Sequence, residues 1–166
     1  DRLSKLMKIV ILIPVFNDFK SASKLIEEID INISNLNALF SVIVMNDAST
    51  EEKILETKNL NNIKSLKLIN MRNNKGHARC IAAGLKHISE NEDFDYVIPM
   101  DGDGEDRPEE IRNFLEKIKN NPYQSIVGER VKRSEGLIFK ICYFFHKIFT
   151  YTFTGKFIKF GNFTCL

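Results

Sequence analysis

Short apolar runs alternate with amphipathic segments along the first 127 residues of the chain. The run at 8–15 is almost continuously apolar and β-branched, which is typical of a strand that is buried on both faces of a parallel sheet. Four further runs predict strands at 41–45, 66–69, 96–100 and 125–127. Between them, helices are predicted at 21–36, just after Ser49, at 78–88 and at 107–119.

This alternation predicts an α/β fold with a mostly parallel sheet flanked by helices. The carboxyl ends of parallel strands share one edge of the sheet, and ligands bind preferentially at that edge. Polar clusters follow three of the predicted strands, at 17–18, 46–47 and 101–106. We therefore expect these clusters to meet in one site. Ser49 is expected to cap a helix whose first turn carries Glu51 and Glu52.

Composition narrows the function classes. A length of 166 residues suggests one domain, and a net charge of +2 gives no field for gripping nucleic acid. Three cysteines without C-x-x-C spacing argue against a disulfide framework and against a zinc site. The same cysteine usage favours a reducing cytosol. Neither a signal peptide nor an apolar run long enough to span a bilayer is evident in the sequence, so we do not expect this chain to cross a membrane.

The segment 101–106 carries four carboxylates within six residues, directly after an apolar strand. Hard oxygen ligands with glycine spacers suit Mg²⁺, Mn²⁺ or Ca²⁺, which substrate phosphates would share. The simpler interpretation is a solvated turn whose acids cap the following helix. An EF-hand is disfavoured, because Asp106 and Arg112 occupy the loop positions that need Gly and Glu. A phosphatase fits less well, because its acids usually follow the first strand, not the fourth.

Four segments resemble glycosyltransferase family 2 in order and spacing. They are Ile-Leu-Ile-Pro-Val-Phe-Asn at 11–17, Val-Met-Asn-Asp-Ala-Ser at 44–49, Asn-Lys-Gly-His-Ala-Arg at 74–79 with Ala-Gly at 83–84, and Asp-Gly-Asp at 101–103 with Pro-Glu at 108–109. The resemblance covers about 8–133 and is strongest to dolichol-phosphate mannose synthases and bacterial polyprenyl-phosphate glycosyltransferases. It implies a GT-A fold, a nucleotide-sugar donor (UDP or GDP), Mg²⁺ or Mn²⁺, and inversion at the anomeric carbon.

The resemblance also implies roles for individual residues. Donor-binding residues would be Pro14, Phe16, Asn17, Asp47, Gly76, Arg79 and Asp101. Among them Asp47 would recognise the base, and Arg79 would meet phosphate charge near a helix N-terminus. Metal ligands would be Asp103 and Glu105, and the catalytic set would be Asp101, Asp103, Arg130 and Arg133. His77 is expected to be a cap or surface residue.

Two departures from the family pattern stand out. The family more often has Asp-Asp-Gly-Ser where this chain has Asn-Asp-Ala-Ser at 46–49, so one acid is absent and the turn is stiffer. Glu105 replaces a neutral amide, which adds negative charge next to the expected metal and leaves the identity of the metal open.

The acceptor is expected to be a polyprenyl phosphate. Arg130 and Arg133 follow the fifth predicted strand, and guanidinium groups bind phosphate oxygens bidentately. A phosphate acceptor is already ionised, so it requires no general base. The alternatives are a transferase that acts on a hydroxyl of a cell-surface glycan, or a non-catalytic module that binds nucleotide or metal and docks on a membrane.

The C-terminal part of the chain differs in composition. Of the 13 Phe and 4 Tyr residues, 10 lie between Phe139 and Phe163. We expect 1–133 to form the catalytic core, and 134–166 to be an acceptor or membrane-interface segment of the same domain. A membrane-interface helix at 137–153 would make the protein peripheral to the cytoplasmic face, whereas a buried or homodimer-forming helix is the competing interpretation. The stop at Leu166 suggests a longer protein.

Overall fold

The computed structural model describes residues 6–51, 54–57, 59–103 and 106–120, and the short strands at 126–127 and 164–165. The main sheet has four strands, β1 (Met7–Val15), β2 (Ala38–Asn46), β3 (Ile63–Asn70) and β4 (Tyr96–Pro99). The helices are α1 (Phe19–Asn32), α2 (His77–Asn91) and α3 (Glu110–Asn120). A separate two-stranded sheet pairs β5 (Ile126–Val127) with β6 (Thr164–Cys165).

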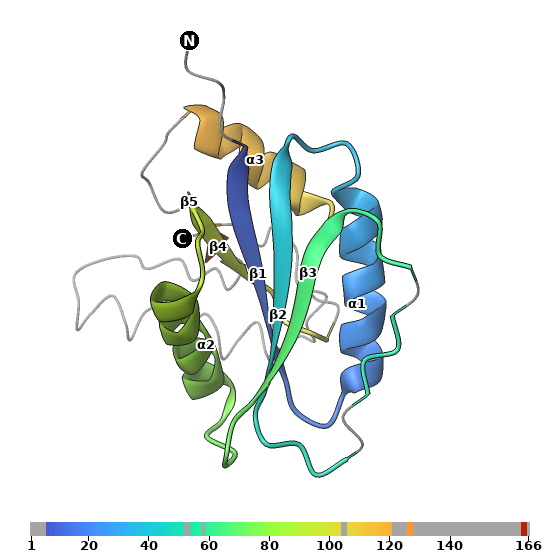
Figure 1. Ribbon diagram of the computed structural model, residues 1–166, viewed down its shortest axis with the longest axis vertical. Helices are drawn as coiled ribbons and strands as arrows, with labels where there is room; N and C mark the ends of the chain where they lie inside the picture. Colours follow the sequence, from blue (N-terminus) through green and yellow to red (C-terminus); the bar gives the residue numbers. More distant parts are fainter. Residues whose placement is uncertain are drawn as a thin grey trace, which may run out of the picture. The chain divides into compact units, whose positions relative to one another are not determined.

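The four strands of the main sheet are all parallel and lie in the order β3-β2-β1-β4 (Figure 1). The predicted α/β fold with a parallel sheet is therefore confirmed. β1 lies between β2 and β4, and its last seven residues are all buried. The unbroken apolar run in the sequence reflects this position, because both faces of an interior strand are covered by other elements.

Helices cover both faces of the sheet (Figure 1). α2 lies on one face, where Val10 and Leu12 of β1 and Ile43 of β2 pack with its Cys80 and Ile88. α1 and α3 lie on the opposite face. The alternate residues of β1 are buried on that face, because successive strand residues point to opposite sides of the sheet. The sheet is thus the middle of three layers.

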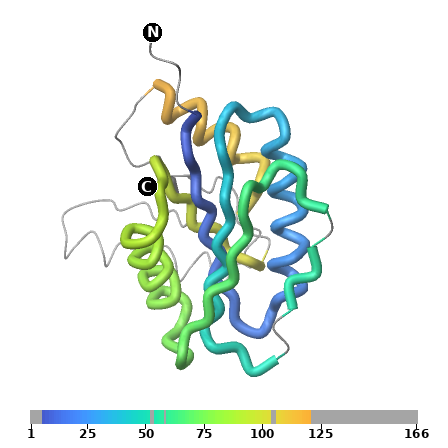
Figure 2. The backbone as a smooth tube through the Cα atoms, viewed as in Figure 1, coloured from blue at the N-terminus to red at the C-terminus, as the bar shows by residue number. Residues whose placement is uncertain are grey.

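The helix predicted after Ser49 is wrong. The described residues between β2 and β3 contain no helix, and the segment runs in an irregular path along α1 (Figure 2). Ser49 is buried, its hydroxyl donates to Asn46 Oδ1 at 2.6 Å, and its oxygen accepts the Asn17 N–H at 2.9 Å. A hydroxyl occupied by these tertiary contacts does not cap a helix of its own.

The bounds of α1 also differ from the prediction of 21–36. The helix begins earlier, because the Asp18 carboxylate accepts the Ser21 N–H at 3.1 Å and caps the first turn. It ends at Asn32, after which the chain turns into β2.

The chain divides into two compact units, one formed by Asp1–Ile126 with Thr164–Leu166 and the other by Val127–Phe163. The four-stranded sheet and its three helices all belong to the first unit. The predicted aromatic segment at 134–166 lies almost entirely outside the described residues, so its assignment to the same domain stays a prediction. In the described part, no helix is both long enough and apolar enough to cross a bilayer.

A close approach between α2 and β1 generates a stability prediction. A Cβ atom added at Gly84 would lie 2.6 Å from Cδ1 and 3.2 Å from Cγ of the fully buried Leu12. Gly84→Ala is therefore expected to lower the free energy of unfolding by about 1 to 3 kcal/mol, because the packed core must shift. Urea unfolding measures this. Ala82→Leu, on the exposed side of α2, is the control and should change stability by less than about 0.5 kcal/mol. An equally stable Gly84→Ala variant would contradict the close approach.

Asp30 ties α1 to the segment that enters β3. Its carboxylate, in a residue that is 6% exposed, accepts the backbone N–H groups of Asn61, Asn62 and Ile63 at 3.1, 2.8 and 2.9 Å. Burial alone would raise the pKa of this carboxyl, but these hydrogen bonds outweigh burial and hold the pKa below its ordinary value of 3.8. The ionised form is therefore the one that stabilises the fold.

Asp30→Asn is expected to cost about 1 to 3 kcal/mol at neutral pH, because a charged acceptor of several buried N–H groups is lost. A lowered folded pKa means that the stabilisation is fully present above the unfolded pKa and disappears as the pH falls through the folded pKa. The difference from wild type should thus be constant down to about pH 5 and shrink below about pH 4. Urea unfolding against pH measures it, with the exposed Glu116→Gln as control. A pH-independent difference would contradict this account.

Candidate functional site

The turns that follow the strands meet at the carboxyl edge of the sheet (Figure 1). Backbone hydrogen bonds continue past the strand ends there. The Asp47 N–H donates to Val15 O, Met71 N–H to Asn46 O, and Met100 N–H to Leu12 O, each at 2.9 Å. The polar clusters after β1, β2 and β4 therefore lie at one edge of the sheet, as expected for parallel strands.

The turn after β1 is built around Asn17, whose φ of 53° lies in the left-handed region that asparagine tolerates. Its N–H donates to Ser49 Oγ, and its Oδ1 accepts the Thr50 N–H at 2.8 Å. These bonds fix the turn after β1 against the turn after β2. Phe16, just before Asn17, is 50% exposed and presents an aromatic ring to solvent beside them, whereas Pro14 is buried in β1.

The end of β2 carries a buried polar network. Asn46 is fully buried, and its Nδ2 donates to Asn70 Oδ1 at the end of β3 at 2.7 Å. Its Oδ1 accepts both the N–H and the hydroxyl of Ser49. Ala48 has a φ of 56°, a conformation that glycine adopts more easily, which accounts for the glycine usual in the resembled pattern. Together these bonds hold the polar turn against β3.

Asp47 is 3% exposed, and both of its carboxylate oxygens accept backbone N–H groups. Oδ1 accepts from Lys75 at 2.7 Å and Oδ2 from Gly76 at 2.8 Å, so the acid binds the turn that leads into α2. Buried charges need such partners, because an isolated carboxylate away from water is very costly. The prediction that Asp47 recognises a base stays untested.

Cys80 lies in the first turn of α2, and its thiol donates to Met45 O at 3.3 Å. Burial of the fully covered side chain is the main cause that raises the pKa of this thiol to about 11, and the negative charge of Asp47 raises the pKa further. The negative charge of Asp47 thus acts on a group in the first turn of α2, where the positive end of the helix dipole favours an anion.

The N-terminus of α2 faces the acidic turn after β4. Gly76 is the N-cap, with a φ of 84° that favours glycine and with no side-chain hydrogen bond of its own. His77, the next residue, places Nε2 3.1 Å from Asp101 Oδ1. Arg79, two residues after His77 in the first turn of α2, is exposed. Sequence analysis predicted only a capping or surface role for His77, because a lone histidine has no spacing that identifies its partner.

The acids of the turn after β4 differ in exposure. Asp106 is 3% exposed, and its Oδ2 accepts the Asp101 N–H at 2.8 Å. The Asp101 side chain is 21% exposed and Asp103 is exposed. Asp106 therefore shapes the turn through its buried carboxylate, whereas the carboxylates of Asp101 and Asp103 remain accessible to solvent.

Among the residues that the structure describes, no three His, Cys, Asp or Glu side chains converge on one point as a ready-made metal centre. The expected ligand Glu105 lies outside the described residues. Asp101 and Asp103 are nevertheless hard oxygen donors on an accessible turn. Mg²⁺ and similar ions often keep several waters and bind through one or two carboxylates plus substrate phosphates, so the donors present fit such an ion.

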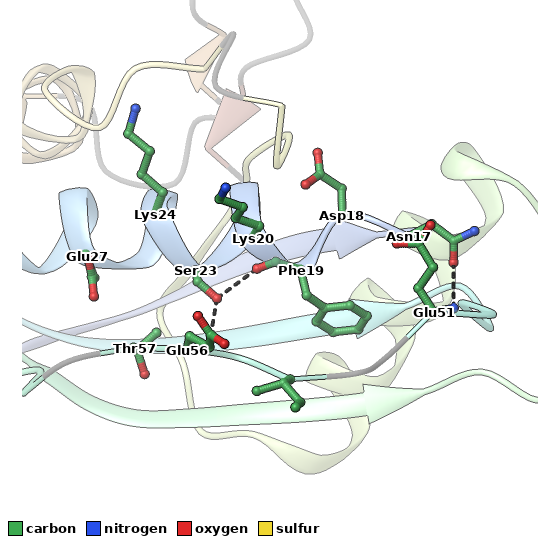
Figure 3. A pocket seen from close by; sticks show the side chains of 11 residues that line it. Asn17, Asp18, Phe19, Lys20, Ser23, Lys24, Glu27, Glu51, Glu56 and Thr57 are labelled. Atoms are coloured by element: carbon green, nitrogen blue, oxygen red, sulfur yellow. Dashed lines mark hydrogen bonds between the residues drawn. The ribbon is translucent and has the colours of Figure 1, made fainter.

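A pocket of about 970 Å³ opens beside the site, between the first half of α1 and the segment after β2 (Figure 3). Asn17 and Glu51 line the end of the pocket nearest the site. Ser23 joins its two walls, since the hydroxyl donates to Phe19 O at 2.8 Å and its oxygen accepts the Glu56 N–H at 3.0 Å. The residues that line the pocket carry charges of both signs. Across the described residues every buried polar side-chain atom has a partner, so no orphaned group marks a ligand here.

The structure brings all seven predicted donor-binding residues and the predicted metal ligand Asp103 to one edge; the seven are Pro14, Phe16, Asn17, Asp47, Gly76, Arg79 and Asp101. The expected acceptor residues Arg130 and Arg133, like Glu105, lie outside the described residues. Asn46 and Asn70 had no predicted role as a pair. Each of them is the polar last residue of a strand, and this position is the sequence signal that could have identified the pair.

A parallel sheet between two helical layers, with polar turns at its carboxyl edge, is an α/β arrangement of the GT-A type. The chain belongs to glycosyltransferase family 2, because the sequence model of that family, "Glycosyl transferase family 2", matches residues 10–165. Both the fold class and the family that the sequence predicts are thus confirmed.

Two curated relatives illustrate the similarity. The chain is 28% identical over 126 residues to a dolichol-phosphate mannosyltransferase of Pyrococcus furiosus, a match that covers 76% of this chain and 34% of the relative. It is 27% identical over 164 residues to an undecaprenyl-phosphate 4-deoxy-4-formamido-L-arabinose transferase of Yersinia enterocolitica, covering 98% of this chain and 48% of the relative. The chain thus spans a third to a half of the length of these proteins.

A solved structure shares the fold. The TarS fragment 1–349 of S. aureus, in complex with UDP-GlcNAc, superimposes with a TM-score of 0.58 at 18% sequence identity. The match covers 79% of this chain and 37% of that one. At this identity the similarity supports the GT-A fold alone.

Proposed function

We propose that the protein is an inverting glycosyltransferase that transfers a sugar from a nucleoside diphosphate to a polyprenyl phosphate. The observation that carries this proposal is the contact between His77 and Asp101. It places the acidic turn, which carries the proposed cation ligands, beside the N-terminus of α2, where backbone N–H groups and the helix dipole favour phosphate. A sugar donor needs both features, since the helix N-terminus can bind its diphosphate and the acidic turn can bind the accompanying cation.

Donor binding is assigned to the edge where the turns meet. The half-exposed ring of Phe16 offers a stacking surface for a base or ribose, and Asn17 fixes the turn that presents this ring. Gly76 leaves the backbone open to close approach, because nothing lies within 4 Å of the position of its absent Cβ. Arg79, exposed near the N-terminus of α2, supplies positive charge for the diphosphate. UDP and GDP are both candidate nucleotides.

Mg²⁺ or Mn²⁺ is the proposed cofactor, with Asp103 and Glu105 as its ligands and Asp101 on the donor side. When bound, such an ion neutralises the charge that develops on the leaving diphosphate. The protein's own contribution is to hold the acidic turn in place. Asp106 does so by accepting the Asp101 N–H from a buried position.

The acceptor is proposed to be a polyprenyl phosphate at the cytoplasmic face of a membrane. The two relatives whose matches cover 76% and 98% of this chain have names that specify dolichol phosphate and undecaprenyl phosphate, respectively. An ionised phosphate oxygen attacks the anomeric carbon without a general base, and Arg130 and Arg133 are proposed to orient it. The membrane contact is assigned to the aromatic segment at 137–153.

Removal of the Asp103 carboxylate is expected to make nucleotide affinity independent of the metal. Calorimetry of the whole protein with UDP and GDP, with and without Mn²⁺, should give tighter nucleotide binding with the metal in wild type. Asp103→Ala should lose that gain, and turnover should fall by about a hundredfold, because a ligand of the charge-neutralising ion is missing. Glu90→Ala, at the far end of α2, is the control for removing an exposed acid. An unchanged Mn²⁺ dependence in Asp103→Ala would refute the metal assignment.

The acceptor class has its own test. Membrane lipid extracts incubated with the whole protein and labelled donors should yield a lipid-linked sugar that mild acid releases, as expected for a glycosyl polyprenyl phosphodiester. Glycosylation of a glycan with no labelled lipid would instead support the hydroxyl-acceptor alternative. Nucleotide binding without transfer to either acceptor would support the non-catalytic module.

A further inference from the structure

Asp101 is the first residue of the acidic turn after β4, and two other residues hold it. The backbone just before it is bonded to the sheet, since the Met100 N–H donates to Leu12 O at 2.9 Å. The Asp101 N–H then donates to Oδ2 of the buried Asp106 at 2.8 Å, and Asp101 Oδ1 lies 3.1 Å from Nε2 of His77. Asp106 thus holds the backbone of Asp101, and His77 contacts its side chain.

The contact between His77 and Asp101 depends on where the histidine carries a hydrogen. An ionised carboxylate offers only acceptor oxygens, so Nε2 approaches Oδ1 favourably only when Nε2 carries a hydrogen. The neutral ring with its hydrogen on Nε2 and the imidazolium both meet this condition. A side chain at position 77 that cannot place an N–H here loses the contact with Asp101.

His77 reaches Asp101 from a rigid element. It is the first residue of α2, and this helix packs on the sheet through the buried Cys80, Gly84 and Ile88. The His77 side chain itself is 59% exposed, and exposed ion pairs contribute little to folding stability. The contact therefore matters little for the fold. It joins the N-terminus of α2, where the diphosphate is proposed to bind, to the turn that carries the proposed cation ligands.

We infer that His77 is a positioning residue for the sugar donor: it holds Asp101, and with it the acidic turn, where the turn can bind the cation that accompanies the diphosphate. His77 acts through Asp101 and not by contact with phosphate. The inference rests on the proposed function, because it presupposes that a nucleoside diphosphate and a divalent cation bind at this edge of the sheet.

A positioning role of this kind makes the effect of His77 depend on the cation. Without a cation, the carboxylates of the acidic turn and the phosphates of the nucleotide carry charges of the same sign, so holding the turn in place brings no gain in nucleotide affinity. With a cation, the turn and the diphosphate bind the same ion, and the position of the turn then matters. A direct contact from His77 to phosphate would act in both conditions.

The variants His77→Gln and His77→Asn test the need for an N–H at this place. Both replace the ring by a neutral amide. The amide nitrogen of Gln can lie about where Nε2 lies, whereas the amide nitrogen of Asn reaches only about as far as Nδ1. The matched control is His87→Asn, because His87 is also in α2 and its Nε2 lies 3.9 Å from Glu92 Oε1, away from the site.

Calorimetry of the whole protein with UDP and GDP gives the first readout. With Mn²⁺, His77→Asn should bind both nucleotides about tenfold more weakly than wild type, because contacts that orient a metal site from outside its ligands typically contribute tenfold or more. His77→Gln should stay within about threefold of wild type, since it restores the N–H. Without metal, both variants should bind as wild type does. His87→Asn should match wild type in both conditions.

Hydrogen–deuterium exchange of the whole protein without nucleotide or metal gives a second readout. The Asp101 N–H is bonded to Asp106, so its exchange reports how firmly the turn is held. Peptides that cover 100–103 should exchange faster in His77→Asn than in wild type, and at about the wild-type rate in His77→Gln. Thermal unfolding should be almost unchanged in both variants, because the His77 side chain is exposed.

Four results would overturn the inference while leaving the proposed function intact. They are wild-type affinity of His77→Asn with Mn²⁺, an equal loss of affinity in His77→Gln and His77→Asn, a loss of the same size with and without metal, and unchanged exchange at 100–103. Wild-type protein that bound neither nucleotide, or bound both without regard to Mn²⁺, would instead contradict the proposed function. The wild-type measurement therefore tells the two failures apart.

Discussion

The parallel pairing of β1 between β2 and β4 is the constraint on which the site depends. Because β1 is buried along its last seven residues, its register with both neighbours is fixed by the packing of two helical layers. Parallel strands leave the sheet at the same edge, so the turns after β1, β2 and β4 must share a small region. Every polar group of those turns then needs a partner within it.

Short polar side chains at the strand ends supply these partners. Asn17, Asn46 and Asp47 bind the backbone of turns that lie 3 to 34 residues away in sequence, and Asn46 also reaches Asn70 across the neighbouring strand. This over-determination explains why Asn17 and Ala48 keep left-handed backbone conformations, which cost free energy for residues other than glycine. A rigid edge of this kind suits a site that must hold a charged donor in one orientation.

Local sequence patterns predicted the parts of this arrangement that local forces decide. The continuous apolar run at 8–15 identified the central strand, and helical spacing identified α2 and α3, because burial imposes these periodicities directly. The helix after Ser49 was wrong because the Ser49 hydroxyl is taken by Asn46 and Asn17, the latter 32 residues away. The partners of Asp47 were equally invisible, since no periodicity encodes a bond between a strand end and a distant glycine turn.

The acidic residues of the protein differ in solvent exposure, and the sequence alone does not show this difference. Asp30, Asp47 and Asp106 are each at most 6% exposed, and each accepts backbone N–H groups, so their charges stabilise turns. Asp101 and Asp103 follow the same strand as Asp106 but keep solvent-accessible carboxylates. In the sequence the acids of 101–106 look alike, and only the fold separates the one that builds the turn from those that can meet a ligand. Because buried carboxylates satisfied by N–H groups have little left to offer a cation, the proposed metal chemistry falls to the accessible acids.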